Sequence, residues 1–99
     1  MALKLDEVSG SELSITDGEA PILTYCYGRD LHKPYFHPIY TPNELIVTDD
    51  IPEDYPYHHG LCFGWENVNG INYWEETNCD ESARGRIVHR EFREKAVNL

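Results

Sequence analysis

Basic residues are scarce in this 99-residue chain, which has 8 Lys and Arg against 18 Asp and Glu and a net charge of −10. Nucleic-acid binders draw most of their affinity from basic patches that neutralise phosphate, so this composition argues against a nucleic-acid partner. The C-terminal end is the exception, because five of the basic residues gather there: Arg84, Arg86, Arg90, Arg93 and Lys95. We interpret this basic tail as a solvated face that pairs with acidic neighbours.

Long apolar runs and paired cysteines are also missing. No run approaches the roughly 20 apolar residues that span a bilayer, so we expect no membrane partner. The acidic start MALKLDEV differs from a signal peptide, and we expect a cytoplasmic protein. Cys26, Cys62 and Cys79 are odd in number and form no CxxC pair, which argues against a disulfide framework and a zinc knuckle. We interpret them as free thiols in a reducing compartment.

Helical periodicity is absent over any helix-length segment except the ambiguous residues 86–93, which we interpret as a strand rather than a helix. Aromatics make up 12% of the chain and favour pleated surfaces. Asp17-Gly18 and Asn69-Gly70 are tight-turn signals. We expect a single all-β domain over residues 1–99: an antiparallel β-sandwich, or half of a larger supersandwich, with little or no helix. The expected strands cover residues 3–8, 13–16, 22–27, 45–48, 60–65, 71–74 and 86–93.

Three prolines punctuate the segment 33–42. Pro34, Pro38 and Pro42 exclude a helix interior and a central strand with a complete hydrogen-bond ladder. The segment should therefore be extended, either as a sheet edge or as irregular backbone. An unpaired strand edge elsewhere in the sheet would be able to pair with another chain, so we also expect a homo-oligomer to form through an edge strand.

The adjacent pair His58-His59 lies between an acidic, proline-bearing loop and a predicted strand. Neighbouring residues of a strand point to opposite faces, so only one of the two rings can enter a given pocket. Histidine suits acid–base chemistry near neutral pH. The structural alternative is a loop histidine bonded beside Tyr55 and Tyr57. Our candidate catalytic residues are His58, Asp54, His37 and His89.

Aromatic and amide side chains follow the histidine pair closely. Sugar C–H faces stack on aromatic rings, and sugar hydroxyls need polar partners with fixed geometry. The alternative is that the tryptophans are core residues. The sequence has no nucleophile elbow, P-loop or dinucleotide fingerprint, so we expect no cofactor, and we assign no metal ligands. Our candidate substrate-binding residues are Trp65, Trp74, Asn69 and Tyr57.

Several segments together resemble the N-terminal third of the PmoA-family proteins. They are the run KPYFHPIYTPNELIVTDDIPEDYPYHHGLCFGWENVNGINYWEE, the preceding ITDGEAPILTYCYG, and GRIVH. The resemblance covers about Leu13 to Phe92. It implies a soluble β-sandwich protein linked to carbohydrate, with a sugar or sugar acid as partner. It does not imply methane oxidation, because this chain has neither a membrane span nor a copper-like set of ligands.

The resemblance also has departures, concentrated in one segment. Where the family pattern runs Asp-His-x-His-His-Arg-Gly-Leu-Trp, this chain has Tyr55 and Tyr57 for His, His59 for Arg and Cys62 for Trp. These changes predict a divergent, truncated or inactive copy. We therefore keep three hypotheses: a carbohydrate-linked protein, an interaction module that oligomerises through a strand edge, and a metal-dependent enzyme with a His-based site. Whether the chain is an enzyme stays open.

Overall fold

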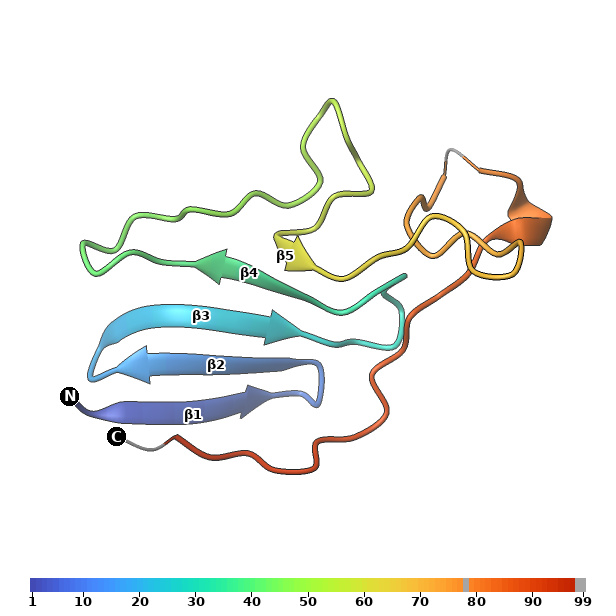
Figure 1. Cartoon of the computed structure of the whole chain (residues 1–99). Helices are drawn as coiled ribbons and strands as arrows, with labels where there is room; N and C mark the ends of the chain where they lie inside the picture. The colour runs from blue at the N-terminus through green and yellow to red at the C-terminus, as the bar shows by residue number, and fades with distance from the viewer. Residues whose placement is uncertain (78, 98–99) are drawn as a thin grey trace.

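A single antiparallel sheet organises the chain in the computed structural model, which describes residues 1–77 and 79–97. Its strands are β1 (Leu3–Val8), β2 (Glu12–Asp17), β3 (Ala20–Cys26), β4 (Tyr35–Ile39) and β5 (Leu61–Cys62). They lie side by side in the order of the sequence, as Figure 1 shows. One 3-10 turn, η1 (Glu81–Ala83), is the only helical element among the described residues. The predicted all-β antiparallel fold with almost no helix is confirmed.

The first three strands form where the turn chemistry predicts them. Ser9 and Gly10 both have positive φ between β1 and β2, and Gly18 has positive φ in the turn before β3. Gly18 also donates its backbone N–H to the Ala2 carbonyl at 2.9 Å. The predicted strands at residues 3–8, 13–16 and 22–27 are therefore confirmed, each within a residue or two.

Cross-strand pairing gives the sheet one largely apolar face and one mixed face. One row of paired residues crosses all five strands: Glu7, Leu13, Tyr25, Phe36 and Leu61. A second row, Leu5–Ile15–Leu23, runs beside it. On the opposite face Ser14 Oγ lies 3.1 Å from Thr24 Oγ1, and a row beside this pair joins Val8, Glu12, Cys26, Tyr35 and Cys62. Directly opposed residues share a face, so this pattern is that of one sheet of a sandwich.

Four expectations about strands need correction. Residues 45–48 contribute a single bridge from Ile46 to Tyr40, and residues 71–74 contribute bridges at Ile71 and Asn72 only. Of the predicted strand 60–65, only Leu61–Cys62 form a strand, which is β5. Pro38 lies inside β4, which has a neighbouring strand on each side, β3 and β5. The proline-bearing segment is therefore not the sheet edge that was one of its two expected conformations. The ladder is incomplete there, because the β3–β4 pairing has an irregularity and β5 pairs with Tyr35 and Phe36 alone.

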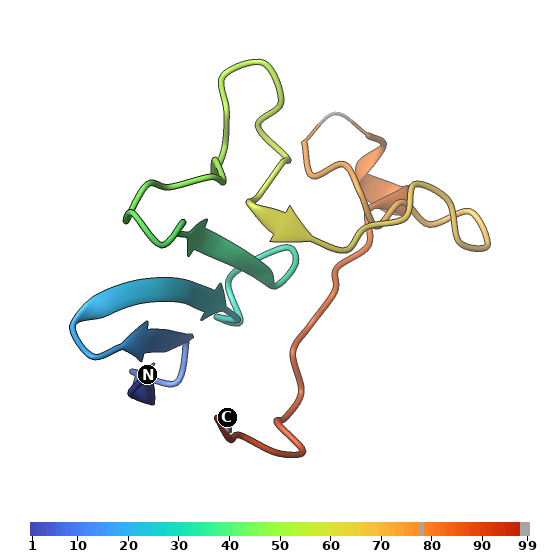
Figure 2. The same ribbon diagram turned by 60° about the vertical axis from the view of Figure 1, so that its left-hand side comes forward.

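The predicted C-terminal strand 86–93 is wrong: the segment is extended but joins no ladder. We call residues 86–97 the strap. It runs back towards the N-terminus, as Figures 1 and 2 show, and its side chains line a cavity with those of the apolar face. The strap lies over a face rather than beside an edge, so its backbone does not meet the free N–H and C=O groups of a strand. One backbone bond, Ile87 N–H to the His32 carbonyl at 2.9 Å, fixes its start.

Side chains hold the rest of the strap. Phe92 packs edge-on against Tyr25 and Tyr27, and the His89 ring lies 4.6 Å from that of Tyr27. His89 Nδ1 is 3.1 Å from the Tyr25 hydroxyl. At the far end Lys95 donates to Glu7 at 2.8 Å, and the Tyr27 hydroxyl donates to the same carboxylate at 2.6 Å. The buried apolar residues of the described chain, Cys26 and Tyr27, belong to this end of β3.

The attachment of the strap should depend on pH at both extremes. Hydrogen bonds from Lys95 and Tyr27 lower the pKa of Glu7 below its ordinary value of 4.5. The bond to Glu7, together with burial, raises the pKa of Tyr27 from 10.0 to about 12. Stabilisation from Glu7 is therefore complete above pH 4.5 and lost as the pH falls through its lowered pKa. Stabilisation from Tyr27 is complete below pH 10 and lost as the pH rises towards 12.

We expect the strap to be most firmly attached between these limits. Ring-current-shifted NMR signals of Phe92 across a pH titration measure this. Glu7→Gln should remove the acidic limb of the profile, whereas Glu19→Gln, in the exposed β2–β3 turn, should leave it unchanged. A Phe92 profile that is the same in wild type and Glu7→Gln would contradict the assignment.

Candidate functional site

The two loops that flank β5 form the candidate site. The first loop folds back on itself between Asp50 and His59, with Ile51 donating to the His58 carbonyl at 2.9 Å. The second loop follows β5, and its tip is the predicted Asn69-Gly70 turn, where both residues have positive φ. Tyr73 N–H donates to the Trp65 carbonyl at 2.8 Å and closes that loop. The tight turn at Asn69-Gly70 is thus confirmed.

His58 is held by aromatic rings. The Tyr55 ring stacks on it at 4.8 Å with an angle of 12°, and Trp74 and Tyr57 lie at 5.0 and 4.9 Å. Tyr57 also meets Trp74 edge-on at 5.9 Å. Three of the candidate residues predicted from sequence, Tyr57, His58 and Trp74, therefore come together. Within residues 1–77 and 79–97, the backbone of His58 is hydrogen-bonded, but its ring nitrogens make no hydrogen bond.

The two tryptophans have different surroundings. Trp65 is 61% exposed, whereas Trp74 is half-buried. Gly64 packs against the Trp74 ring so closely that an added Cβ would overlap it. The Lys33 ammonium lies 4.6 Å from the centre of that ring. Trp74 is therefore a packed support, and Trp65 is the tryptophan whose surface is free to stack.

Two further candidates lie at the margins of these loops. Asp54 is exposed in the first loop, and Asn69 is exposed at the tip of the second. The two loops also carry most of the nearby acidic residues: Asp49, Asp50, Glu53, Asp54, Glu66, Glu75 and Glu76. The electrostatic environment of the site is therefore negative, which disfavours an anionic ligand.

The other two histidines proposed from sequence have separate neighbours. His37 Nδ1, on β4, lies 2.6 Å from the Thr48 hydroxyl, which also accepts from the Ile39 N–H. His89 belongs to the strap and packs on Tyr25 and Tyr27 over the apolar face. Neither histidine shares a contact with His58, so the sheet and strap place the three rings in different surroundings.

His59 is the residue that sequence reasoning passed over. It is 8% exposed and sits between two carboxylates, with Nδ1 at 2.6 Å from Asp50 and Nε2 at 2.7 Å from Glu76. Each of its ring nitrogens therefore has a carboxyl group as hydrogen-bond partner. Tyr35 stacks on its face at 5.0 Å.

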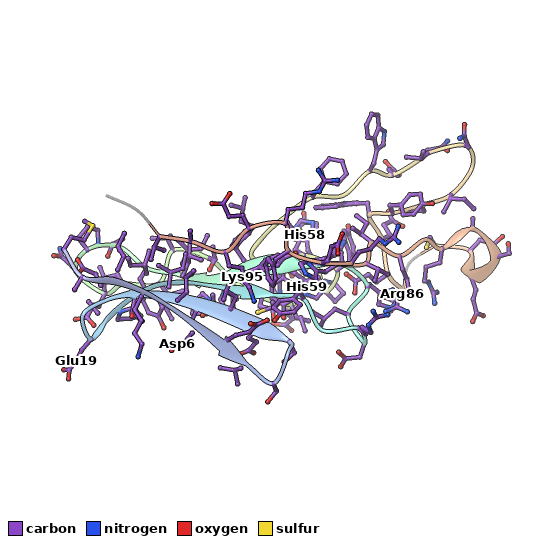
Figure 3. All side chains as sticks on the ribbon, turned by 90° about the horizontal axis from the view of Figure 1, so that it is seen from below. Asp6, Glu19, His58, His59, Arg86 and Lys95 are labelled. Atoms are coloured by element: carbon purple, nitrogen blue, oxygen red, sulfur yellow. The ribbon has the colours of Figure 1, made fainter. Side chains whose placement is uncertain are left out.

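Lys33 completes this buried cluster. It is 1% exposed, lies 3.3 Å from Glu76 and donates to the Trp74 carbonyl at 2.5 Å. The cluster of Lys33, Asp50, His59 and Glu76 thus sets one lysine and one histidine against two carboxyl groups. Buried charges persist where they are paired and hydrogen-bonded, as these are. Figure 3 labels His58 and His59. The His58 ring contacts Trp74, whereas the His59 ring belongs to this cluster.

Nearby hydroxyl and thiol groups are kept neutral by the same surroundings. Burial, and then the Asp50 charge, raise the pKa of Tyr35 well above its usual range. Burial also raises the pKa of the Cys26 thiol. Within residues 1–77 and 79–97, no group of three or more His, Cys, Asp or Glu side chains is arranged to hold a metal ion. The described residues contain no helix long and apolar enough to cross a bilayer.

Comparison with known proteins gives one match. A family model with the description "Family of unknown function (DUF6807)" matches residues 12–98. No curated protein and no solved structure matches the chain. The family model covers β2 to β5, both loops of the candidate site and the whole strap, so this chain belongs to the DUF6807 family.

Proposed function

We propose that this protein binds a neutral carbohydrate through the aromatic surface formed by Tyr55, Tyr57, His58 and Trp65, with Trp74 as its support. The observation that carries the proposal is His58, a ring fixed between Tyr55 and Trp74 whose nitrogens have no partner in the described chain. A fixed ring loses little conformational entropy when it hydrogen-bonds a ligand. The predicted resemblance to the PmoA family points the same way.

The exposed aromatic groups supply the other half of sugar recognition. Tyr55, 52% exposed, stacks on His58, and Trp65, 61% exposed, follows Gly64, which packs against the Trp74 ring. Aromatic faces take the apolar C–H side of a sugar ring, and carboxylate and amide groups around them take its hydroxyls. The acidic loops disfavour a sugar acid, so a neutral sugar fits better than the charged partner that we also considered.

Isothermal titration calorimetry tests this proposal, with D-glucose, D-galactose and their oligosaccharides as neutral probes and D-glucuronate as the acidic probe. We expect binding of at least one neutral probe and none of D-glucuronate. His58→Ala and Trp65→Ala should each weaken the binding about tenfold, which corresponds to about 1.4 kcal/mol. That loss is the size expected for one hydrogen bond or one stacking contact.

Phe63→Ala is the matched control. Like Trp65, Phe63 is an exposed aromatic residue, at 68%, and it lies two positions earlier in the sequence. Unlike Trp65, it lines a cavity with Tyr25 and Phe36 of the apolar face. Its removal should leave sugar binding unchanged. Equal affinities in wild type, His58→Ala and Trp65→Ala, with unchanged circular dichroism, would refute the proposed surface.

A further inference from the structure

We propose that Asn72 is a positioning residue of the aromatic surface, because its side chain fixes the backbone turn that carries Trp74. Asn72 is half-buried in the second loop, three positions after Asn69 at the tip. Its Oδ1 atom accepts from the Trp74 N–H at 2.8 Å and from the Glu75 N–H at 3.0 Å. An Asn side chain that bonds the backbone two residues ahead closes an Asx turn. This inference rests on the proposed function, since it assigns the residue that prepares the same surface for its ligand.

The main chain of Asn72 is anchored separately from its side chain. Its N–H donates to the Ala83 carbonyl at 2.7 Å, and its carbonyl accepts from the Gly85 N–H at 2.6 Å. Both partners lie just before the strap. Removing the Asn72 side chain therefore leaves these two bonds in place and releases only the turn bonds to Trp74 and Glu75. Asn72 thus joins an anchored backbone to the residue that supports the binding surface.

Trp74 transmits this constraint to His58. Lys33 donates to the Trp74 carbonyl at 2.5 Å, so side chains hold both backbone polar groups of Trp74. The Trp74 ring lies 5.0 Å from the His58 ring and 5.9 Å from that of Tyr57. A loosened turn would let the Trp74 ring occupy other positions. The apparent affinity for a ligand then falls in proportion to the fraction of molecules that keep the binding arrangement.

The Asn72 side chain can be tested separately from the buried cluster. Lys33 also pairs with Glu76, so replacing Lys33 would disturb a buried ion pair as well as Trp74. Within residues 1–77 and 79–97, the hydrogen bonds of the Asn72 side chain are the two that close the turn. Asn72→Ala removes both, whereas Asn72→Asp keeps an oxygen acceptor in the same place. Rescue by aspartate therefore identifies these hydrogen bonds as the cause of any effect.

Acrylamide quenching of tryptophan fluorescence measures the position of Trp74 without any ligand. The chain has two tryptophans, so a Trp65→Phe background leaves Trp74 as the sole emitter of tryptophan fluorescence. We expect Asn72→Ala to raise the quenching constant about twofold, because a loosened turn opens the half-buried ring to the quencher. Asn72→Asp should return the constant to its value in the background chain.

Calorimetry with the neutral sugars then measures the effect on binding, in chains that keep Trp65. Asn72→Ala should weaken the binding about fivefold, which is the effect expected if about a fifth of the molecules keep the binding arrangement. Asn72→Asp should stay within about twofold of the wild-type affinity, because its carboxylate still accepts from both N–H groups of the turn.

Asn67→Ala is the matched control for both measurements. Asn67 Oδ1 accepts from the Gly70 N–H at 2.8 Å, so it makes the same kind of side-chain-to-backbone bond in the same loop. Asn67 is exposed, and the turn that it closes is the loop tip rather than the turn that carries Trp74. Asn67→Ala should therefore leave the quenching of Trp74 and the sugar affinity unchanged.

The outcomes separate this inference from the proposed function. If no probe sugar binds the wild-type chain, the proposed function fails, and higher quenching in Asn72→Ala still supports the positioning of Trp74. Unchanged quenching in Asn72→Ala overturns the inference whether or not a sugar binds. An equal rise in Asn67→Ala also overturns it, as does unchanged sugar affinity in Asn72→Ala when the wild type binds. Circular dichroism of both alanine variants should match that of the wild type, because the backbone bonds of Asn72 remain.

Discussion

Lys33→Met is expected to lower the free energy of unfolding by about 3 kcal/mol or more, the largest effect of any single charge removal in this chain. Lys33 is 1% exposed and balances Glu76, which also accepts from His59. Without the ammonium, the buried Glu76 carboxylate loses its lysine partner. A domain of this size has only about 5–15 kcal/mol of stability, so the loss is a large part of the total. Urea denaturation followed by circular dichroism measures it.

Lys4→Met is the control for this prediction. Lys4 also lies within ion-pair distance of a carboxylate, at 3.5 Å from Asp6, but its side chain is 68% exposed. Exposed pairs contribute about 0–1 kcal/mol, so the same substitution should have little effect there. The double variant Lys33→Met with Glu76→Gln should recover part of the loss, because it removes the uncompensated charge. Equal losses in Lys4→Met and Lys33→Met would show that the buried cluster has no special importance.

Gly60→Ala is expected to cost about 3 kcal/mol or more, for two reasons. Gly60 has φ +46, a conformation that costs an alanine about 1–2 kcal/mol. A Cβ there would also overlap the Phe36 carbonyl oxygen and lie 2.8 Å from the His37 Cβ. Both atoms belong to β4, so the clash would push β5 and the site loops away from the sheet. Crowding of this kind adds about 1–3 kcal/mol.

Gly18→Ala separates the two causes in the same urea experiment. Gly18 has φ +61 but nothing within 4 Å of the position that a Cβ would take. It should therefore show only the conformational cost, about 1–2 kcal/mol. If Gly60→Ala lowers the free energy of unfolding no more than Gly18→Ala does, β4 can move away from the added Cβ without loss of stability, and the expected clash would be refuted.

Local sequence signals predicted the elements whose partners are close in the sequence. The hairpins β1–β2 and β2–β3 follow from alternating apolar residues and glycine turns, and Asn69-Gly70 follows from its own backbone preference. The predicted strands 45–48 and 86–93 were wrong because β-suitable side chains do not ensure a neighbouring strand to pair with. His89 and Phe92 find aromatic rings on a face instead.

The candidate site also has one part that the sequence predicted and one part that it did not. The contact of Tyr57, His58 and Trp74 could be anticipated, because aromatic residues cluster in that part of the sequence. The buried cluster could not, since Lys33 meets Glu76 across 43 positions and nothing around either residue signals burial. The partners of His59 could not be anticipated either, because Asp50 precedes it and Glu76 follows it at positions that no local pattern connects.

The meander order of the sheet has a consequence for how the chain folds. Each strand pairs with the next in sequence, so zippering closes short loops as far as β4 and one longer loop, residues 40–60, before β5. The strap is different, because Lys95 reaches Glu7 across 88 positions and closes the longest loop in the described chain. Closing that loop has the largest entropic cost, and the strap gains few contacts in return. The strap should therefore dock last during folding and detach first, well before the strands beneath it separate.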